Sequence, residues 1–309
     1  MIVPKRILVT PASLCADRDL LSPLAAFHSI EYSAQHLPSD LDRYSALILG
    51  NETFDRESFR AARNLRIIVR YGVTFHNVDL RAAADHNVVV THCPQIATTS
   101  VSEYVLATSL LMIKQLNHVN KRPSRELTEF KFADFSNKSF GVIGLGNIGE
   151  RVARTMQALG LRVLIYNRSD KSPTCDKLGV TQTTLERVLQ YSDIVSVHLT
   201  LNDETRGLMG HGQFKHMRAG ALFINTSQAG LVDPAALAVA LESGHLGGVV
   251  SDFTYPGFDL AAYPNSFVTP HISSRSILST TQKVALVVDT IRDYFNGSKP
   301  PLPNQINPA

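Results

Sequence analysis

Three glycines in the middle of the chain have the spacing of a phosphate-binding turn. Gly144, Gly146 and Gly149 form a G-x-G-x-x-G pattern directly after a short apolar run. In such a turn the first glycine allows a sharp bend, the second lets the backbone approach a pyrophosphate, and the third lets helix and strand pack closely. The start of the next helix offers its free N–H groups to the phosphates. We therefore expect a dinucleotide here, with an ordinary glycine-rich turn of an α/β domain as the alternative.

The segments around this turn have the pattern of a strand, a helix and a second strand. Apolar residues recur at helical spacing after the turn, at Ile148, Val152, Met156 and Leu159. One side of this helix can thus pack on a sheet while its charged side stays in water. A second apolar strand is expected at 161–166. A G-x-G-x-x-G pattern in this context is the dinucleotide-binding fingerprint.

The residues that follow the second strand indicate which dinucleotide fits. An NAD site usually has Asp or Glu there, which binds the ribose 2′-hydroxyl and would repel a 2′-phosphate. This chain has Asn167, Arg168 and Ser169 instead. Arg168 can pair with the 2′-phosphate of NADP, and its two neighbours can donate hydrogen bonds to it. NADP is therefore expected, and Asp170 keeps NAD as the alternative.

Short apolar strands alternate with helical segments along the whole chain, which predicts an α/β fold with two mostly parallel sheets. The strands expected in the first unit are 6–10, 30–33, 46–49, 66–70 and 88–91, and those in the second are 140–143, 161–166, 194–198, 221–225, 247–252 and 266–269. The remaining expected helices are 16–26, 56–62, 80–86, 98–115, 183–190, 212–216, 234–243 and 277–295. The helix 98–115 has a broad apolar surface, so we expect it to be buried between neighbours.

Composition limits the class of protein. A chain of 309 residues with 44% hydrophobic residues has the length of about two domains. Its net charge of +3 comes without a long basic block, which argues against nucleic acid as a partner. Its cysteines, Cys15, Cys93 and Cys175, have no metal-binding spacing, so no metal is expected. Signal-peptide and membrane-spanning patterns are missing, and we expect a cytoplasmic protein that is not membrane-bound.

Five motifs in order resemble the D-2-hydroxyacid dehydrogenase family, and together they are far more specific than any one of them. They are RYGVTFHNVD at 70–79, TTSVSEYVLA at 98–107, GLGNIG at 144–149, NTSQAGLVDPAAL at 225–237 and TPHISS at 269–274. The resemblance implies a flavodoxin-like substrate domain, 1–97 with 280–309, into which a Rossmann dinucleotide-binding domain, 98–279, is inserted. It also implies a substrate site in the cleft between the domains. With the apolar helix 98–115, it suggests a homodimer through the Rossmann domains.

The resemblance also implies roles for individual residues. His271 matches the proton-donating histidine of the family, and Gln228 stands where the family has a catalytic arginine. The substrate-binding residues implied are Tyr71, Gly72, Val73, Thr74, His76 and Arg275. The cofactor-binding residues expected from the turn, the strand tip and the resemblance are Gly144, Gly146, Asn147, Ile148, Gly149, Asn167, Arg168, Ser169, His198, Thr205, Thr226 and Asp252.

Two departures from the family pattern bear on the substrate. Gln228 cannot neutralise a carboxylate or offer a bidentate cationic fork, and Gly257 stands where the family has the glutamate partner of its histidine. We therefore expect hydride transfer to or from a small carbonyl or hydroxy compound other than a standard 2-oxo acid. An imine or another unusual substrate is a variant of this function, and the alternative is a catalytically silent dinucleotide-binding sensor or partner-binding protein.

Three charged residues could compensate for these departures. Asp259 is the only acid close to His271 in sequence. Arg275 or Arg70 could replace the missing cation, although for both arginines simple exposure to solvent is the alternative.

Overall fold

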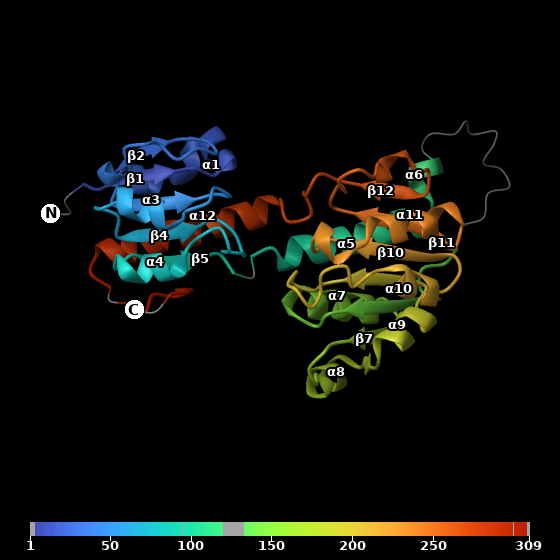
Figure 1. The fold of residues 1–309 in the computed structure, drawn as a ribbon. Helices are drawn as coiled ribbons and strands as arrows, with labels where there is room; N and C mark the ends of the chain where they lie inside the picture. The colour runs from blue at the N-terminus through green and yellow to red at the C-terminus, as the bar shows by residue number, and fades with distance from the viewer. Residues whose placement is uncertain (1–3, 95, 120–132, 299, 308–309) are drawn as a thin grey trace. The chain divides into compact units, whose positions relative to one another are not determined.

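The computed structural model describes residues 4–94, 96–119, 133–298 and 300–307, except for the side chains of 117 and 118. The chain divides into two compact units, Met1–Ile96 with Ile277–Ala309, and Ala97–Ser276 (Figure 1). The sequence-based limits, 1–97 with 280–309 and 98–279, lie close to these.

The first unit is a five-stranded parallel sheet covered by helices. Its strands are β1 (Arg6–Val9), β2 (Ser29–Tyr32), β3 (Ala46–Leu49), β4 (Ile67–Arg70) and β5 (Val89–His92), in the order β2-β1-β3-β4-β5. Its helices are α1 (Ala12–Ala16), η1 (Arg18–Leu21), α2 (Ser22–Ala25), η2 (Leu41–Arg43), α3 (Arg56–Ala61), α4 (Leu80–Asp85) and α12 (Ile277–Phe295). This strand order is that of flavodoxin-like folds, as expected.

Alternating strand residues fill the two cores of this unit. Ile48, Ile67 and Val69 face the core that includes α12, while Leu47 and Ile68 face the opposite core. A strand covered on both faces needs such a continuous apolar run.

The helix expected at 16–26 is interrupted. Asp17 has non-helical backbone angles, φ −124° and ψ 87°, which separate α1 from η1. Pro23 then lies in the first turn of α2, where its missing N–H costs no helical hydrogen bond. The expected single helix was therefore wrong, because hydrophobic spacing does not register a local break in the backbone.

The second unit is a seven-stranded parallel sheet. Its strands are β6 (Ser139–Ile143), β7 (Arg162–Tyr166), β8 (Thr181–Gln182), β9 (Ile194–Val197), β10 (Ala221–Asn225), β11 (Leu246–Ser251) and β12 (Ser266–Val268), in the order β12-β11-β10-β9-β6-β7-β8. Its helices are α5 (Thr98–Ile113), α6 (Leu116–Val119), α7 (Asn147–Ala158), α8 (Ser172–Leu178), α9 (Leu185–Tyr191), α10 (His211–His216), η4 (Ala229–Leu231), α11 (Pro234–Glu242) and η5 (Leu260–Ala262).

The strand order of this unit reverses between β6 and β9, which lie side by side. In an open parallel sheet, ligands bind beyond the carboxyl ends of the strands at such a switch point. The dinucleotide-binding fold that the glycine turn predicted is thus present.

Helix α7 packs on the sheet through the side that its sequence predicted. Val152 and Met156 are fully buried, but Leu159 is 45% exposed because the helix ends at Ala158. Helix α5 buries Val101 and Val105 in the same core, while its other apolar residues are only partly buried. The expected burial of α5 between neighbours is therefore incomplete within this unit.

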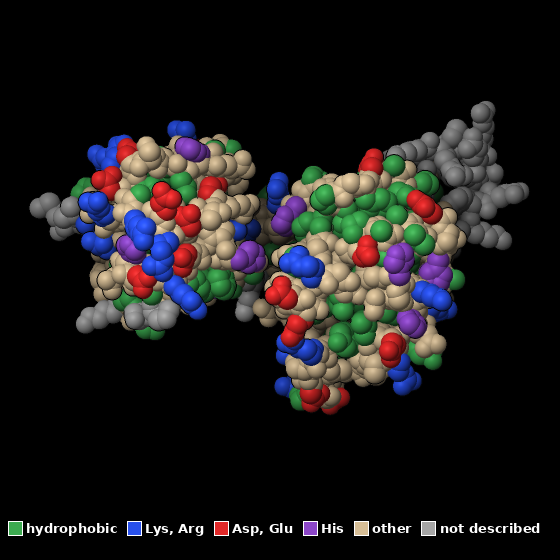
Figure 2. Space-filling model, viewed as in Figure 1, with side chains coloured by type: hydrophobic (Ala, Val, Ile, Leu, Met, Phe, Trp, Pro, Cys, Tyr) green, Lys and Arg blue, Asp and Glu red, His purple; other side chains and the backbone are tan. Residues whose placement is uncertain are grey.

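Charges are mixed on the surface of both units. On the face seen in Figure 2, basic and acidic side chains lie interspersed rather than in one block. Within the described residues, no helix has both the length and the apolar character that crossing a bilayer requires.

Candidate dinucleotide and hydride-transfer site

The glycine turn joins β6 to α7, and its three glycines have different surroundings. Gly144 has a φ of +100°, which favours glycine. A Cβ on Gly149 would lie 2.0 Å from the carbonyl oxygen of Gly144, so helix and turn pack too closely for any side chain. A Cβ on Gly146 would meet no atom within 4 Å. Two glycines thus serve the turn itself, whereas Gly146 keeps open the space in front of it.

The N-terminus of α7 faces this open space without a side-chain cap. Gly146 is the N-cap residue and has no side chain that could accept a hydrogen bond from the first turn. Asn147 and Ile148 begin the helix there. An anion is stabilised at such an end by the free N–H groups and by the helix dipole.

Two buried polar groups follow β9, which lies next to β6, and β10, which lies next to β9. His198 comes directly after β9 and Thr226 directly after β10. Both ring nitrogens of His198 and the hydroxyl oxygen of Thr226 are buried, and none has a hydrogen-bond partner among the described residues. Burial lowers the pKa of His198 to about 4, so its ring is neutral and can both donate and accept. Each unpaired buried group costs about 1–3 kcal/mol, so these atoms fit a polar ligand such as a dinucleotide.

Asn167 connects the glycine turn to the end of β7. Its side-chain oxygen accepts a 3.0 Å hydrogen bond from the N–H of Leu145, and its amide nitrogen donates to the carbonyl and hydroxyl oxygens of Ser169. Asp170 is also engaged, because its carboxylate accepts hydrogen bonds from the N–H and hydroxyl of Ser172. Asn167 and Asp170 therefore also shape the backbone of this region through these hydrogen bonds.

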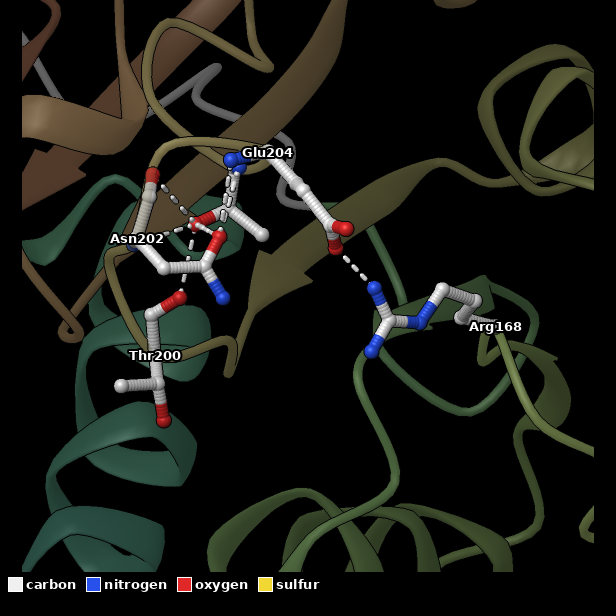
Figure 3. A network of polar contacts seen from close by, with 5 residues as sticks. Arg168, Thr200, Asn202 and Glu204 are labelled. Carbon is white, nitrogen blue, oxygen red and sulfur yellow. Dashed lines mark hydrogen bonds and ion pairs between the residues drawn. The ribbon is translucent and has the colours of Figure 1, made fainter.

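Arg168 has a carboxylate partner that the sequence reasoning did not find. Its guanidinium forms an ion pair with Glu204, from the turn after β9 (Figure 3). Both side chains are exposed, 79% for Arg168 and 68% for Glu204. The hydroxyl of Thr205 donates to the carbonyl oxygen of Thr200 at 2.7 Å, so this expected cofactor ligand is engaged in the turn.

The turn that carries His271 is built on a buried carboxylate. Asp252, fully buried after β11, accepts hydrogen bonds from the hydroxyl of Thr269 at 2.6 Å and from the N–H groups of Ile272 and Ser273 at 2.8 Å. The N–H of His271 donates to the carbonyl oxygen of Asp252, and His271 has a φ of +54°. Asp252 was expected to bind cofactor, and this geometry shows that it also holds the His271 turn in place.

Two aromatic residues support the same turn. The hydroxyl of Tyr104, from α5, shares a 2.6 Å hydrogen bond with that of Thr269. The exposed ring of His271 lies against Phe253, with ring centroids 4.8 Å apart. The imidazole is thus fixed on one side and open to solvent on the other.

Gln228 lies on the loop after β10, at the same carboxyl edge of the sheet. Its carbonyl oxygen accepts a 2.9 Å hydrogen bond from the amide of Asn225. That amide also donates to the hydroxyl of Tyr255, which accepts another bond from Ser251. The half-buried side chain of Gln228 makes no hydrogen bond with any described residue, so its amide is available to a ligand.

No carboxylate in the described part of this unit forms an ion pair with His271. The carboxylate of Asp259 instead accepts a hydrogen bond from the N–H of Ala261 at the start of η5. Gly257 has a φ of +74° in the loop before it. The proposed compensation by Asp259 is therefore not seen, and His271 has no acidic partner among the described residues of its own unit.

The two arginines that could supply a cation differ in their surroundings. Arg275 is exposed, whereas Arg70 in the first unit is buried, with 7% of its surface accessible. The guanidinium of Arg70 donates to the side-chain oxygens of Asn77 and Asn51, both neutral. Exposure was thus the wrong alternative for Arg70, and burial lowers the pKa of this guanidinium.

The substrate-loop residues lie beside Arg70. A Cβ on Gly72 would be 2.3 Å from Nη1 of Arg70, so this glycine leaves the space that the guanidinium fills. Tyr71 and Thr74 are half-buried, and Val73 and His76 are exposed. The ammonium of Lys283 lies 5.5 Å from the centre of the Tyr71 ring, and burial raises the pKa of Tyr71 to about 12.

The sequence profile of the D-isomer specific 2-hydroxyacid dehydrogenase NAD-binding domain matches residues 103–273, more than half of the chain. The chain belongs to the D-isomer specific 2-hydroxyacid dehydrogenase family. Members are NAD(P)-dependent oxidoreductases that act on 2-hydroxy and 2-oxo acids. This confirms the resemblance, the fold class and a nicotinamide dinucleotide as the cofactor.

Three relatives of this dehydrogenase family illustrate the likeness. The chain is 31% identical over 284 residues to D-3-phosphoglycerate dehydrogenase from Archaeoglobus fulgidus, which covers 89% of this chain and 54% of that protein. It is 30% identical over 276 residues to glyoxylate reductase from Korarchaeum cryptofilum, with 85% and 82% covered. The structure of a pyruvate reductase from Chlamydomonas reinhardtii has 25% identity and a TM-score of 0.83, with 97% and 99% covered. The chain thus spans about half the length of the first relative.

Sequence reasoning missed Glu204, Tyr104 and Tyr255. Glu204 is 36 residues from Arg168 and on a different loop, so no local pattern connects them. Tyr104 lies within a motif of the dehydrogenase family, which could have drawn attention to it, but its contact with Thr269 depends on how α5 packs.

Proposed function

We propose that the chain is an NAD(P)-dependent oxidoreductase in which His271 exchanges a proton with the oxygen of a small carbonyl or hydroxy compound. The observation that carries this proposal is the His271 turn, fixed on the buried Asp252 with its ring exposed. It lies at the same carboxyl edge of the sheet as the glycine turn and the unpaired atoms of His198 and Thr226.

The bound dinucleotide would supply or accept the hydride at its nicotinamide ring. In the reducing direction, His271 donates a proton to the oxygen that becomes a hydroxyl, and in the oxidising direction it removes that proton. Asp252 keeps the His271 turn in place through backbone hydrogen bonds. Gln228 donates a hydrogen bond from its free amide to the substrate, without adding charge.

The neutral Gln228 favours a substrate without a carboxylate next to the reacting carbon. A carboxylate in a dehydrated site is costly unless a cation or several donors compensate it.

Replacing Gln228 with arginine is expected to raise kcat/KM for 2-oxo acids by about 10-fold or more, because a guanidinium can hold and polarise the substrate carboxylate. The measurement is steady-state reduction of glyoxylate and pyruvate, with Gln228→Lys as the variant that adds charge without the planar fork. No gain with either variant would mean that other parts of the pocket also exclude 2-oxo acids.

We propose NADP as the preferred cofactor, with NAD as the alternative. Arg168 can pair with a 2′-phosphate, and Asp170, the acid nearest to the end of β7, already accepts two hydrogen bonds from Ser172. Arg168→Ala is then expected to weaken NADPH binding about 10-fold more than NADH binding. Fluorescence titration measures both, and the exposed Arg187→Ala on α9 is the charge-matched control. Equal losses for the two cofactors would contradict the role of Arg168.

The proposed function is tested by turnover of a panel of 2-oxo acids, aldehydes, ketones and imines with both cofactors. Tight dinucleotide binding without any turnover would favour the second candidate, a silent sensor or partner-binding protein. One observation favours that candidate: His271 lacks an acidic partner within the described part of its unit. We further propose a homodimer formed through the second unit and a cytoplasmic location, the latter in keeping with the free Cys15, Cys93 and Cys175.

A further inference from the structure

We propose that Glu204 sets the cofactor preference of this chain, because its carboxylate competes with the 2′-phosphate of NADP for Arg168. This inference rests on the proposed dinucleotide site. It predicts that NADPH must displace Glu204 from Arg168, whereas NADH binds with the pair intact. Glu204 thus weakens the discrimination in favour of NADP that Arg168 alone would give.

The position of the pair follows from the sheet. Arg168 comes after β7 and Glu204 after β9, and these strands flank β6 on its two sides. The glycine turn lies at the carboxyl end of β6, between them in the sheet order. In a dinucleotide fold the ribose next to the adenine lies at the end of the second strand, here β7. The ion pair is therefore made by the very side chain that a 2′-phosphate would use.

The backbone of Glu204 is held in place by hydrogen bonds, while its carboxylate is exposed to solvent and bonded to Arg168. The side-chain oxygen of Asn202 accepts hydrogen bonds from the N–H groups of Glu204 and Thr205, both at 3.0 Å (Figure 3). The hydroxyl of Thr205 fixes the other end of this turn on Thr200. Among the described residues, Arg168 is the only hydrogen-bond partner of the Glu204 carboxylate. The turn at 202–205 is thus fixed by its own hydrogen bonds and places the carboxylate of Glu204 next to the guanidinium of Arg168.

The charges make the competition asymmetric between the two cofactors. An exposed ion pair is weak and screened by salt, so a phosphate with a charge near −2 can replace the carboxylate. The displaced carboxylate of Glu204 would then remain as a negative charge close to that phosphate. Its repulsion lowers the binding free energy that the phosphate gains from Arg168. A 2′-hydroxyl brings no charge, so NADH leaves the Arg168–Glu204 pair undisturbed.

Glu204→Gln tests this inference because glutamine keeps the size of the side chain and removes its charge. We expect the Kd of NADPH to fall about 5-fold at low salt and the Kd of NADH to change less than about 2-fold. The gain for NADPH should shrink at about 0.5 M salt, where surface charges are screened. Fluorescence titration of the full chain with each reduced cofactor gives these constants.

Two further variants make the result specific to the pair. Asp203→Asn removes one exposed negative charge from the same turn without touching Arg168, and it is expected to leave both constants within about 2-fold. When Arg168 is already replaced by alanine, Glu204→Gln should improve NADPH binding by at most half as much as it does alone. The reason is that Arg168, the partner for which the carboxylate and the 2′-phosphate compete, is then missing.

The outcomes separate this inference from the proposed function. If the unaltered chain binds NADPH and NADH but Glu204→Gln changes both constants equally, or neither, the role of Glu204 is overturned and the dinucleotide site stands. An Asp203→Asn effect as large as that of Glu204→Gln also overturns it, since net charge alone would then explain the gain. If the unaltered chain binds neither cofactor, both proposals fall.

Discussion

Replacing His271 with asparagine is expected to lower kcat by about 10²–10⁴-fold, the usual contribution of a positioned proton donor. Asparagine is chosen because it tolerates the left-handed backbone, which His271 adopts with a φ of +54°. The Asp252 turn should therefore persist, since its hydrogen bonds come from backbone groups and Thr269. The loss is expected in kcat, with the Kd of the reduced cofactor unchanged.

Steady-state kinetics with a substrate found in the panel measures this loss. The control is His211→Asn, which changes an exposed histidine at the start of α10, away from the turn. Thermal unfolding of both variants checks that the fold is kept. Unchanged turnover in His271→Asn would exclude this residue as the proton donor.

Two separate variants, each adding one methyl group to a glycine of the same turn, are expected to differ in what they lose. Gly149→Ala should lose stability, whereas Gly146→Ala should lose cofactor binding. In Gly149→Ala the new Cβ would lie 2.0 Å from a backbone oxygen, so helix and turn must separate. Overpacking of this kind costs about 1–3 kcal/mol or more, and a clear fall in Tm should follow. In Gly146→Ala the methyl group meets no protein atom, and its φ of −86° suits alanine. The Tm should therefore stay the same.

Cofactor binding distinguishes the second variant from the unaltered chain. The methyl group of Gly146→Ala would occupy the space in front of α7 where a pyrophosphate is expected. Because NADH and NADPH share the pyrophosphate, we expect the Kd of both to rise about 10-fold or more by the same factor. Binding as tight as that of the unaltered chain would place the pyrophosphate elsewhere.

The parts of the fold that depend on regular patterns could be predicted from the sequence. Apolar runs gave the main strands, and the glycine spacing with Val152 and Met156 gave the orientation of α7. Helix α8 and strand β8 were missed because they are short and carry no clear periodicity. The break at Asp17 was missed because it depends on backbone angles and not on hydrophobic spacing.

The site was less predictable because its side chains bind to distant parts of the chain. A motif marked Asp252, but only the fold shows that it is buried and accepts hydrogen bonds from residues 269–273. For Arg70 exposure to solvent was the alternative, yet the side chain is buried and donates hydrogen bonds to two asparagines from other segments. The Arg168–Glu204 pair bridges loops on opposite sides of β6, so it depends on the strand order.

Because Gly72 lies against the side chain of Arg70, the size of residue 72 determines where the guanidinium of Arg70 can lie. The guanidinium occupies the volume that any larger residue there would need. An alanine would meet the end of a long side chain and not the backbone, so the guanidinium could move while the sheet stayed as it is. A larger residue at position 72 would therefore shift the buried guanidinium of Arg70 to a new position, and the loop would still carry this positive charge.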